Sequence, residues 1–363
     1  MRELCAALAR LDDGTDFRLL VAGAKRAQLP APPGPNFSWR PTAITPRNWA
    51  RLWHRARLPY PVEAITGRVS LFHATDFTLP PTLPGTRTLL TVHDLSFVRV
   101  PETASPPLKA YLDAVVPRSV RRADHVLADS EATREDLIAL YDTPADKITV
   151  LWSGVEARFA PVTSPAALQA VRDRYKLPTG RFLLSVGTVQ PRKNYTRLIE
   201  ALARLRHEIH DLSLVIVGGK GWLEDPIYSA LDQFGLREAV VFTGFADDAD
   251  LPALYTLARA VALPSLYEGF GLPVLEAMAC GTPVVTSNLS SLPEVAGDAA
   301  LLVDPLDVDE LTAALHRLIT DESMRAELRE RGLARAATFT WERAARQLLG
   351  IYSQMLSDKT PAL

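Results

Sequence analysis

Residues 264–285 read Pro-Ser-Leu-Tyr-Glu-Gly-Phe-Gly-Leu-Pro-Val-Leu-Glu-Ala-Met-Ala-Cys-Gly-Thr-Pro-Val-Val, and they predict a helix whose start is framed by glycines. Pro273 suits the first helical position, because its missing N–H would be unpaired there in any case. The amides from Gly269 to Val274 would then be free donors, which attract phosphate. Glu268 before the helix and Glu276 on its first turn can accept hydrogen bonds from sugar hydroxyls. Two glutamates eight positions apart also fit a pair of solvated carboxylates, so the surrounding residues decide.

The composition is that of an ordinary globular protein with room for two hydrophobic cores. The chain has 363 residues, of which 47% are hydrophobic and 23% charged, and this length favours two domains. Cys5 and Cys280 have no metal-ligand spacing and make no disulfide framework, which fits a reducing, cytoplasmic location. The net charge of −2 gives a nucleic-acid partner no general electrostatic support.

Short β-branched and apolar runs alternate with helical patterns, which predicts parallel sheets. The runs form two series and therefore predict two doubly wound α/β domains that bind ligands at the carboxyl ends of their strands. The first series is Phe17–Ala22, Ser70–Ala74, Thr88–Val92, Asp124–Ala128 and Ile148–Leu151, and the second is Phe182–Gly187, Leu214–Gly218, Val240–Gly244, Val261–Leu263, Pro283–Thr286 and Ala300–Val303. The Pro- and Ala-rich stretch 160–170 is the expected linker.

Two adjacent cations, Arg192 and Lys193, follow a predicted strand in the run Gly187-Thr-Val-Gln-Pro-Arg-Lys-Asn194. Cations beside a helix start can neutralise a diphosphate. A leaving nucleoside diphosphate gains negative charge as its bond to the sugar breaks, so fixed positive groups stabilise the transition state more than the ground state. In other settings two adjacent basic residues are a solvated surface feature.

His93 follows another predicted strand, in the run Leu90-Thr-Val-His-Asp-Leu-Ser-Phe97. A histidine in this position is commonly structural. A neutral imidazole can also hydrogen-bond a sugar hydroxyl and help to hold the anomeric carbon in line for attack.

These segments together resemble family 4 of the retaining glycosyltransferases, over most of residues 70–355. Glu268 and Glu276 match the E-x7-E signature of that family, and the Pro-Arg-Lys turn and His93-Asp94 match its phosphate-binding turn and its His-Asp motif. The resemblance implies two Rossmann-like domains facing a cleft, the GT-B architecture. It also implies a nucleotide diphosphate sugar as co-substrate, with no further cofactor and no metal.

The same resemblance implies domain limits and residue roles. It implies domains at 1–160 and 161–340, and a last helix within 341–363 that crosses back to the first domain. Glu268 and His93 would be the catalytic residues in contact with the transferred sugar. The donor contacts would come from Arg192, Lys193, Gly244, Phe245, Gly269, Phe270, Gly271, Leu272 and Glu276, with Gly244 and Phe245 at the nucleobase and Glu276 at the ribose.

The beginning of the first domain departs from this architecture. Residues 1–11 resemble the first helix of the family and 17–22 its second strand, so the first strand and its glycine-rich turn have no counterpart. A missing central strand would leave buried backbone groups unpaired, at a cost of about 1–3 kcal/mol each. We expect either a true start codon upstream of Met1 or an impaired product, and the intact remainder of the site favours the first.

The N-terminal region is basic and rich in tryptophan. Trp49 and Trp53 are spaced to share a helix face, as are Arg51 and Arg55. Tryptophan with arginine suits the headgroup layer of an anionic membrane, so segment 39–58 is a candidate for peripheral contact with the inner face of a membrane. The alternative is that the tryptophans pack on their own domain.

The leading hypothesis is a hexosyltransferase of polysaccharide biosynthesis that moves mannose from GDP-mannose to a hydroxyl of a glycan or lipid-linked acceptor. Other donors, such as UDP-glucose, stay open. Retention requires either a protein nucleophile with double displacement or a same-face attack in which the leaving phosphate takes the acceptor's proton, and the resemblance favours the second route. Two rival classes remain: a truncated, non-catalytic nucleotide-sugar-binding or assembly protein, and an enzyme of another reaction, such as a sugar-nucleotide epimerase.

Overall fold

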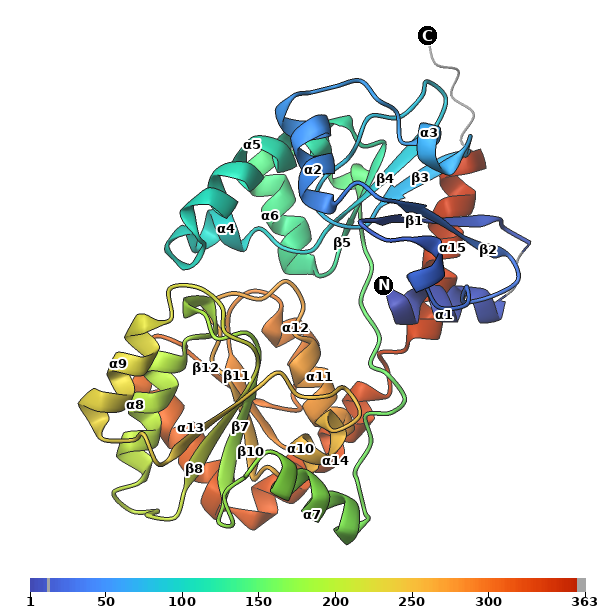
Figure 1. The fold of residues 1–363 in the computed structure, drawn as a ribbon. Helices are drawn as coiled ribbons and strands as arrows, with labels where there is room; N and C mark the ends of the chain where they lie inside the picture. The colour runs from blue at the N-terminus through green and yellow to red at the C-terminus, as the bar shows by residue number, and fades with distance from the viewer. Residues whose placement is uncertain (12–13, 358–363) are drawn as a thin grey trace. The chain divides into compact units, whose positions relative to one another are not determined.

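The computed structural model describes residues 1–11 and 14–357, which divide into two compact units (Figure 1). The first unit comprises Met1–His93, Ala110–Gly154 and the chain from Thr340 onward, and the second comprises Asp94–Lys109 and Val155–Phe339. After Gly154 the chain returns to the second unit at Val155, before the expected linker. That linker contains the start of a helix, because the Ser164 side chain accepts a hydrogen bond from the amide of Ala167 and caps it.

A six-stranded parallel sheet forms the centre of the second unit, in the order β12-β11-β10-β7-β8-β9. Its strands are β7 (Phe182–Val186), β8 (Ser213–Val217), β9 (Val240–Gly244), β10 (Ala260–Leu263), β11 (Val284–Ser287) and β12 (Leu301–Val303). All six were predicted from their apolar runs. The strand order reverses between β7 and β10, and the carboxyl ends of these two strands mark the point where ligands bind in doubly wound sheets.

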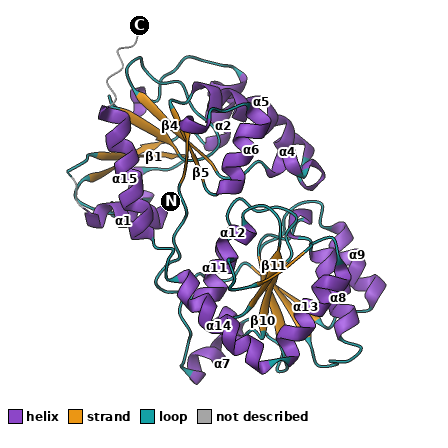
Figure 2. Ribbon diagram, turned by 180° about the vertical axis from the view of Figure 1, so that it is seen from behind, coloured by secondary structure: helices purple, strands orange, loops and turns teal. Residues whose placement is uncertain are grey.

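Helices cover both faces of this sheet (Figure 2). The helical segments assigned to the second unit are α4 (Ser96–Arg99), η3 (Pro101–Thr103), α7 (Pro165–Arg174), η5 (Pro191–Lys193), α8 (Tyr195–Leu205), α9 (Asp225–Phe234), α10 (Leu251–Leu257), α11 (Leu272–Ala279), α12 (Leu292–Ala296), α13 (Val308–Thr320) and α14 (Glu322–Ala336), of which α4 and η3 do not belong to the two groups on the sheet. One group consists of α8 packed against α9 and α13. The other is a row in which α7 contacts α10, α10 contacts α11, and α11 contacts α14.

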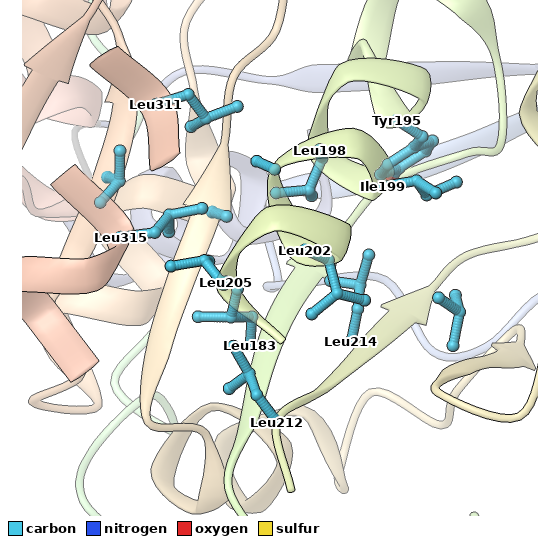
Figure 3. Close-up of a cluster of buried hydrophobic side chains, with 14 of the residues drawn as sticks. Leu183, Tyr195, Leu198, Ile199, Leu202, Leu205, Leu212, Leu214, Leu311 and Leu315 are labelled. Atoms are coloured by element: carbon cyan, nitrogen blue, oxygen red, sulfur yellow. The ribbon is translucent and has the colours of Figure 1, made fainter. Parts of the chain in front are cut away.

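The core of the second unit lies between α8, α13 and the sheet. Leu198, Leu202 and Leu205 recur at helical spacing on α8, so they face one side of the helix, and Figure 3 shows them beside Leu183 of β7 and Leu315 of α13. All five are at most 2% exposed. Complete burial of each leucine side chain contributes about 1.5–3 kcal/mol. This core fixes the sheet whose strand ends carry the candidate site.

The first unit contains two separate parallel sheets, β1-β2 and β3-β4-β5-β6. The strands are β1 (Phe17–Ala22), β2 (Phe37–Thr42), β3 (Leu71–Ala74), β4 (Arg87–Val92), β5 (His125–Ala128) and β6 (Ile148–Val150). The helices are α1 (Arg2–Leu11), η1 (Arg26–Gln28), α2 (Pro46–Ala50), the π-helical η2 (Arg51–Arg55), α3 (Glu63–Thr66), α5 (Pro106–Arg122, which begins in the second unit), α6 (Glu131–Tyr141), η4 (Ala145–Lys147) and α15 (Trp341–Ser357).

The two sheets share one apolar core with α1 and α15 but no strand pairing. Leu8, Phe37, Leu89, Leu127 and Leu348 contribute to this core from α1, β2, β4, β5 and α15. Among the described residues no backbone hydrogen bond joins β1 to β3. Every residue of β1 is only half-buried, whereas β4 is buried along most of its length.

The tryptophan-rich segment 39–58 contains a strand as well as helical turns. Trp39 lies on β2, a strand that the sequence did not reveal, while Trp49 lies on α2 and Trp53 on η2. Trp49 is only 5% exposed, so it packs on its own unit. Within residues 1–11 and 14–357, every helix is too short or too polar to cross a lipid bilayer.

Candidate functional site

The loops that follow β7 and β10 are joined at the point where the strand order reverses. The amide of Leu266 donates to the carbonyl of Arg192 at 2.9 Å. The Asn194 side-chain amide donates to the carbonyl oxygens of Pro264 at 2.9 Å and Pro305 at 2.7 Å. These bonds hold the predicted phosphate-binding turn against the stretch that begins the glutamate motif.

Glu268 bridges both predicted phosphate-binding cations. Its Oε1 lies 2.6 Å from Lys193 Nζ and its Oε2 lies 2.7 Å from Arg192 Nη1. The same Arg192 nitrogen donates to the carbonyl of Tyr267 at 2.6 Å. The three charged side chains are 10–17% exposed. The sequence assigned the two cations to the diphosphate and Glu268 to the sugar of the same donor, and the structure places all three in one cluster with a net charge of about +1.

The cluster is ionised. Burial by itself raises the pKa of the Glu268 carboxyl, but the charges of Lys193 and Arg192 and their hydrogen bonds outweigh burial and hold that pKa at about 2. Burial lowers the pKa of Lys193, and the Glu268 carboxylate opposes this change. Glu268 therefore keeps the two cations in place and compensates for part of the cost of their burial.

Small and hydroxyl side chains make room for this cluster and fix its backbone. A Cβ at Gly187 would lie 2.8 Å from Lys193 Cε, so only glycine leaves space for the lysine. The Glu268 amide donates to Ser290 Oγ at 2.9 Å, and Ser291 Oγ donates to the Glu268 carbonyl at 2.9 Å. The two serines follow β11, so the loops after three neighbouring strands meet at Glu268.

The start of α11 supplies free amides beside the cluster. Gly271 precedes the helix with a φ of 114°, and a Cβ there would lie 2.9 Å from Leu292 Cδ2, so both the backbone and the space require glycine. The amides of residues 269–272 donate to no acceptor within the described part of the chain. Since α11 begins at Leu272, Pro273 occupies the second position, and Glu276 lies past the first turn rather than on it.

Glu276 does not join the charged cluster. Its Oε2 accepts a hydrogen bond from the hydroxyl of Tyr255, on α10, at 2.7 Å. Burial raises the pKa of Glu276 to about 7, against the effect of the Tyr255 hydrogen bond, so the carboxyl is partly protonated near neutral pH. Tyr255 is fully buried and its hydroxyl holds one glutamate oxygen. It is a residue that the sequence gave no reason to choose.

The predicted base-binding residues end strand β9. Gly244 has a φ of 70°, and its carbonyl accepts a hydrogen bond from the Gly218 amide at 2.9 Å. Phe245 follows with 78% of its surface exposed. An aromatic ring this exposed is available for stacking on a flat ligand such as a nucleobase.

His93 lies in the first unit and differs from the expected neutral imidazole. Its Nδ1 is 2.8 Å from Asp129 Oδ2 and its Nε2 is 3.0 Å from the Thr75 carbonyl oxygen. Burial by itself lowers the pKa of His93. The hydrogen bond and charge of Asp129 raise that pKa by more than burial lowers it, to about 9. The ring is therefore protonated at neutral pH and donates from both nitrogens. The expectation of a neutral ring was wrong, because Asp129 comes from the neighbouring strand's loop.

The described residues contain no group of three or more His, Cys, Asp or Glu side chains placed to hold a metal ion. Of the residues that sequence reasoning missed, Asn194 and Asp129 directly follow segments that were already suspected, and Ser290 lies in the loop after β11. Their position after strand ends was the available signal.

Solved structures place the fold in a class. The chain superposes on sucrose-phosphate synthase from Thermosynechococcus elongatus with a TM-score of 0.74, over 98% of this chain and 92% of that one, at 23% identity. It superposes on Anabaena Alr3699/HepE in complex with UDP and glucose with a TM-score of 0.72, over 97% and 95% of the two chains, at 22% identity. The two Rossmann-like domains therefore have the GT-B glycosyltransferase fold.

Sequence matches then give the family. Residues 1–159 match Glycosyltransferase Family 4, and residues 170–335 match Glycosyl transferases group 1. O-antigen chain mannosyltransferase B of Escherichia coli is 38% identical over 284 residues, which span 78% of this chain and 74% of that protein. The chain belongs to the family 4, group 1 glycosyltransferases, which confirms the resemblance seen in its motifs.

Replacing Glu268 by glutamine should destabilise the second unit. The change keeps the shape of the side chain but leaves two buried cations without a counter-charge, so we expect the free energy of unfolding to fall by about 3 kcal/mol. Urea unfolding followed by tryptophan fluorescence measures the difference. Arg346→Gln, which breaks the exposed pair with Glu342 on α15, is the control and should cost less than about 0.5 kcal/mol. Equal losses in both variants would contradict the cluster's role.

The titration of Glu276 should appear in the pH dependence of stability. Its folded pKa of about 7 exceeds the ordinary value of 4.5, so its contribution is complete below pH 4.5 and is lost as the pH rises to 7. The loss is at most about 3 kcal/mol. Glu276→Gln should abolish this decline, and the exposed Glu342→Gln should leave it unchanged. An unaltered slope in Glu276→Gln would exclude this carboxyl as its origin.

His93 should titrate near pH 9. Nuclear magnetic resonance of the imidazole carbon-bound protons measures its pKa, and Asp129→Asn should lower that pKa towards 6.5 by removing the charge partner. Asp309→Asn, in the second unit, is the control. A His93 pKa that stays near 9 in Asp129→Asn would show that Asp129 does not hold the proton.

Proposed function

We propose that this glycosyltransferase transfers a hexose, with retention of configuration, from a nucleotide diphosphate sugar to a hydroxyl of a glycan or lipid-linked acceptor. The observation that carries the proposal is the combination of a buried Arg192–Glu268–Lys193 cluster with free amides at the start of α11. Both lie where the strand order of the second unit reverses. Fixed cations and free amides at such a point suit a diphosphate.

The cluster explains how a diphosphate is bound and stabilised as it leaves. The two cations are held charged by Glu268, so they need no reorganisation when negative charge develops on the leaving oxygen. Glu268 can still accept a hydrogen bond from a hydroxyl of the transferred sugar, because a carboxylate has more acceptor sites than these two bonds use. Glu276 takes the ribose hydroxyls and Phe245 stacks on the base.

The reaction step is a same-face displacement. The acceptor oxygen forms a bond to the anomeric carbon while the bond from that carbon to the donor phosphate oxygen breaks. The acceptor's proton passes to the departing phosphate oxygen, so the products are the glycoside and a nucleoside diphosphate. Glu268 acts electrostatically and forms no covalent bond. His93 contacts the transferred sugar as a charged donor, once its bond to the Thr75 carbonyl is released.

GDP-mannose is the proposed donor. Support comes from the 38% identity to a protein named O-antigen chain mannosyltransferase B, which also favours a growing surface polysaccharide as acceptor. UDP-glucose is the comparison donor, since the structure of Alr3699/HepE holds UDP and glucose.

A non-catalytic nucleotide-sugar-binding protein is the second candidate. The observation that favours it is the separation of the strands of the first unit into two sheets. Such a protein would bind the donor through the second unit and release no nucleoside diphosphate.

Calorimetric titration of the full chain with GDP-mannose and with UDP-glucose tests donor binding. We expect binding of GDP-mannose, and Lys193→Ala should weaken it about 10- to 100-fold because a charge-assisted hydrogen bond to phosphate is lost. Glu276→Ala should weaken it by a similar factor, and Arg346→Ala, on the exposed face of α15, should not. Tight binding of UDP-glucose alone would refute the GDP-mannose assignment.

Turnover separates the two candidates. Release of GDP with formation of a mannoside supports the transferase, and donor binding with neither product supports the binding protein. For the transferase, Glu268→Gln should lower kcat by roughly 100-fold or more, with no glycosyl adduct on the protein by mass spectrometry. An adduct isolated on Glu268 of the native enzyme would refute the same-face route.

A further inference from the structure

One continuous segment of the first unit carries only positive charge. Between Asp16 and Glu63 the sequence has no acidic residue. The cations of this segment are Arg18, Lys25, Arg26, Arg40, Arg47, Arg51, Arg55 and Arg57. In a chain whose net charge is −2, such a local excess of one sign creates a positive surface potential.

Six of these cations are exposed and have no counter-charge among the described residues. They are Lys25, Arg26, Arg47, Arg51, Arg55 and Arg57. None of the six is paired with a carboxylate anywhere in residues 1–11 and 14–357, and Arg51 donates only to the neutral side chain of Asn48. Arg18 contrasts with them, because it pairs with Asp16 at 3.0 Å. The six side chains are therefore free to bind an anionic partner.

Helical spacing places three of these cations on one face of the segment formed by α2 and η2. Arg47, Arg51 and Arg55 recur every fourth residue along α2 and η2, and this spacing keeps side chains on one face of an α-helix or of a π-turn. The loop after β1 lies beside the start of α2, because the Gly23 amide donates to the carbonyl of Ile44 at 2.9 Å. Lys25 and Arg26 are thereby kept near the same helix.

Apolar side chains end this helical stretch. Trp49 and Trp53 stack with ring centroids 4.2 Å apart, and Tyr60 stacks on Trp49 at 6.0 Å. The Trp53 indole N–H donates to the Tyr60 carbonyl at 2.8 Å, so the tryptophans hold the loop that follows η2. Leu58 and Tyr60 are left 45% and 47% exposed in that loop. The tryptophans are structural, and Leu58 and Tyr60 are the apolar groups that can reach a partner.

We propose that residues 47–60 bind the surface of a bilayer that contains anionic phospholipid. The arginines would lie at the lipid phosphates, and Leu58 and Tyr60 would enter the interfacial layer. Charge complementarity identifies this partner, and the exposed leucine and tyrosine beside unpaired arginines distinguish it from a polyanion, which needs the charges alone. The proposal does not depend on which sugar the enzyme transfers.

Co-sedimentation of the full chain with vesicles tests the proposal. The chain should bind vesicles of phosphatidylcholine containing about one third phosphatidylglycerol, and should not bind vesicles of phosphatidylcholine alone. Each basic residue at such a surface contributes about 5-fold to partitioning, so Arg51→Glu with Arg55→Glu should reduce binding by about 30-fold or more. Lys176→Glu with Arg317→Glu, two exposed cations of the second unit, make the same change in net charge and should leave binding within about 3-fold.

A second variant tests the apolar part. Leu58→Ser with Tyr60→Ser should lose about 10-fold in binding, and this loss should persist when salt screens the charges. Circular dichroism confirms that each variant is folded. Three results would overturn the proposal: no preference of the native chain for anionic vesicles, equal losses in the control variant, or unchanged vesicle binding in the Leu58/Tyr60 variant. The last result would identify a site for any polyanion, and competition by heparin measures it.

Discussion

One buried carboxylate between two cations organises the second unit. Glu268 joins the turn after β7, which carries Arg192 and Lys193, to the loop after β10, and two serines after β11 bind its backbone. Without this carboxylate the cations would repel each other in a poorly solvated place. With it they stay charged and fixed beside the free amides of α11. A diphosphate bound as proposed at this edge of the sheet would therefore depend on a carboxylate that holds the two cations in place.

Most of the fold could be predicted because nearly all strands read as short, largely apolar runs, and those that precede candidate site residues, β4, β7, β10 and β11, are buried along most of their length. The exception, β2, shows the limit of that signal. Its sequence Phe37-Ser-Trp-Arg-Pro-Thr42 contains a proline and three polar side chains, as suits a strand paired on one side only. The residues of a single strand do not indicate which strands it pairs with. A separation of β1 from β3 could be expected only by comparing the order of elements along the chain with that of the family.

The site could be predicted as a set of residues but not as a set of contacts. Spacing identified Glu268 and Lys193, yet 75 positions separate them, and only the register of β7 beside β10 brings them within 2.6 Å. The neutral state expected for His93 failed for the same reason, since Asp129 reaches it from the neighbouring strand β5. Tyr255 was missed because a tyrosine in a short apolar helix has the appearance of an ordinary core residue.

The two sheets of the first unit share no backbone hydrogen bonds among the described residues, so each can unfold separately from the other. Within the described residues, the β1-β2 sheet can open without the loss of any backbone hydrogen bond of β3–β6. Its packing on α1 and α15 and the hydrogen bonds from Arg18 to the carbonyls of Thr66 and Arg68 oppose this opening. The amide protons of β1 and β2 should exchange with solvent through local opening, at a lower free energy than the amides of β4 and β5. The strand β4, which directly precedes His93, thus belongs to the more persistent part of the unit, while the β1-β2 sheet can open independently.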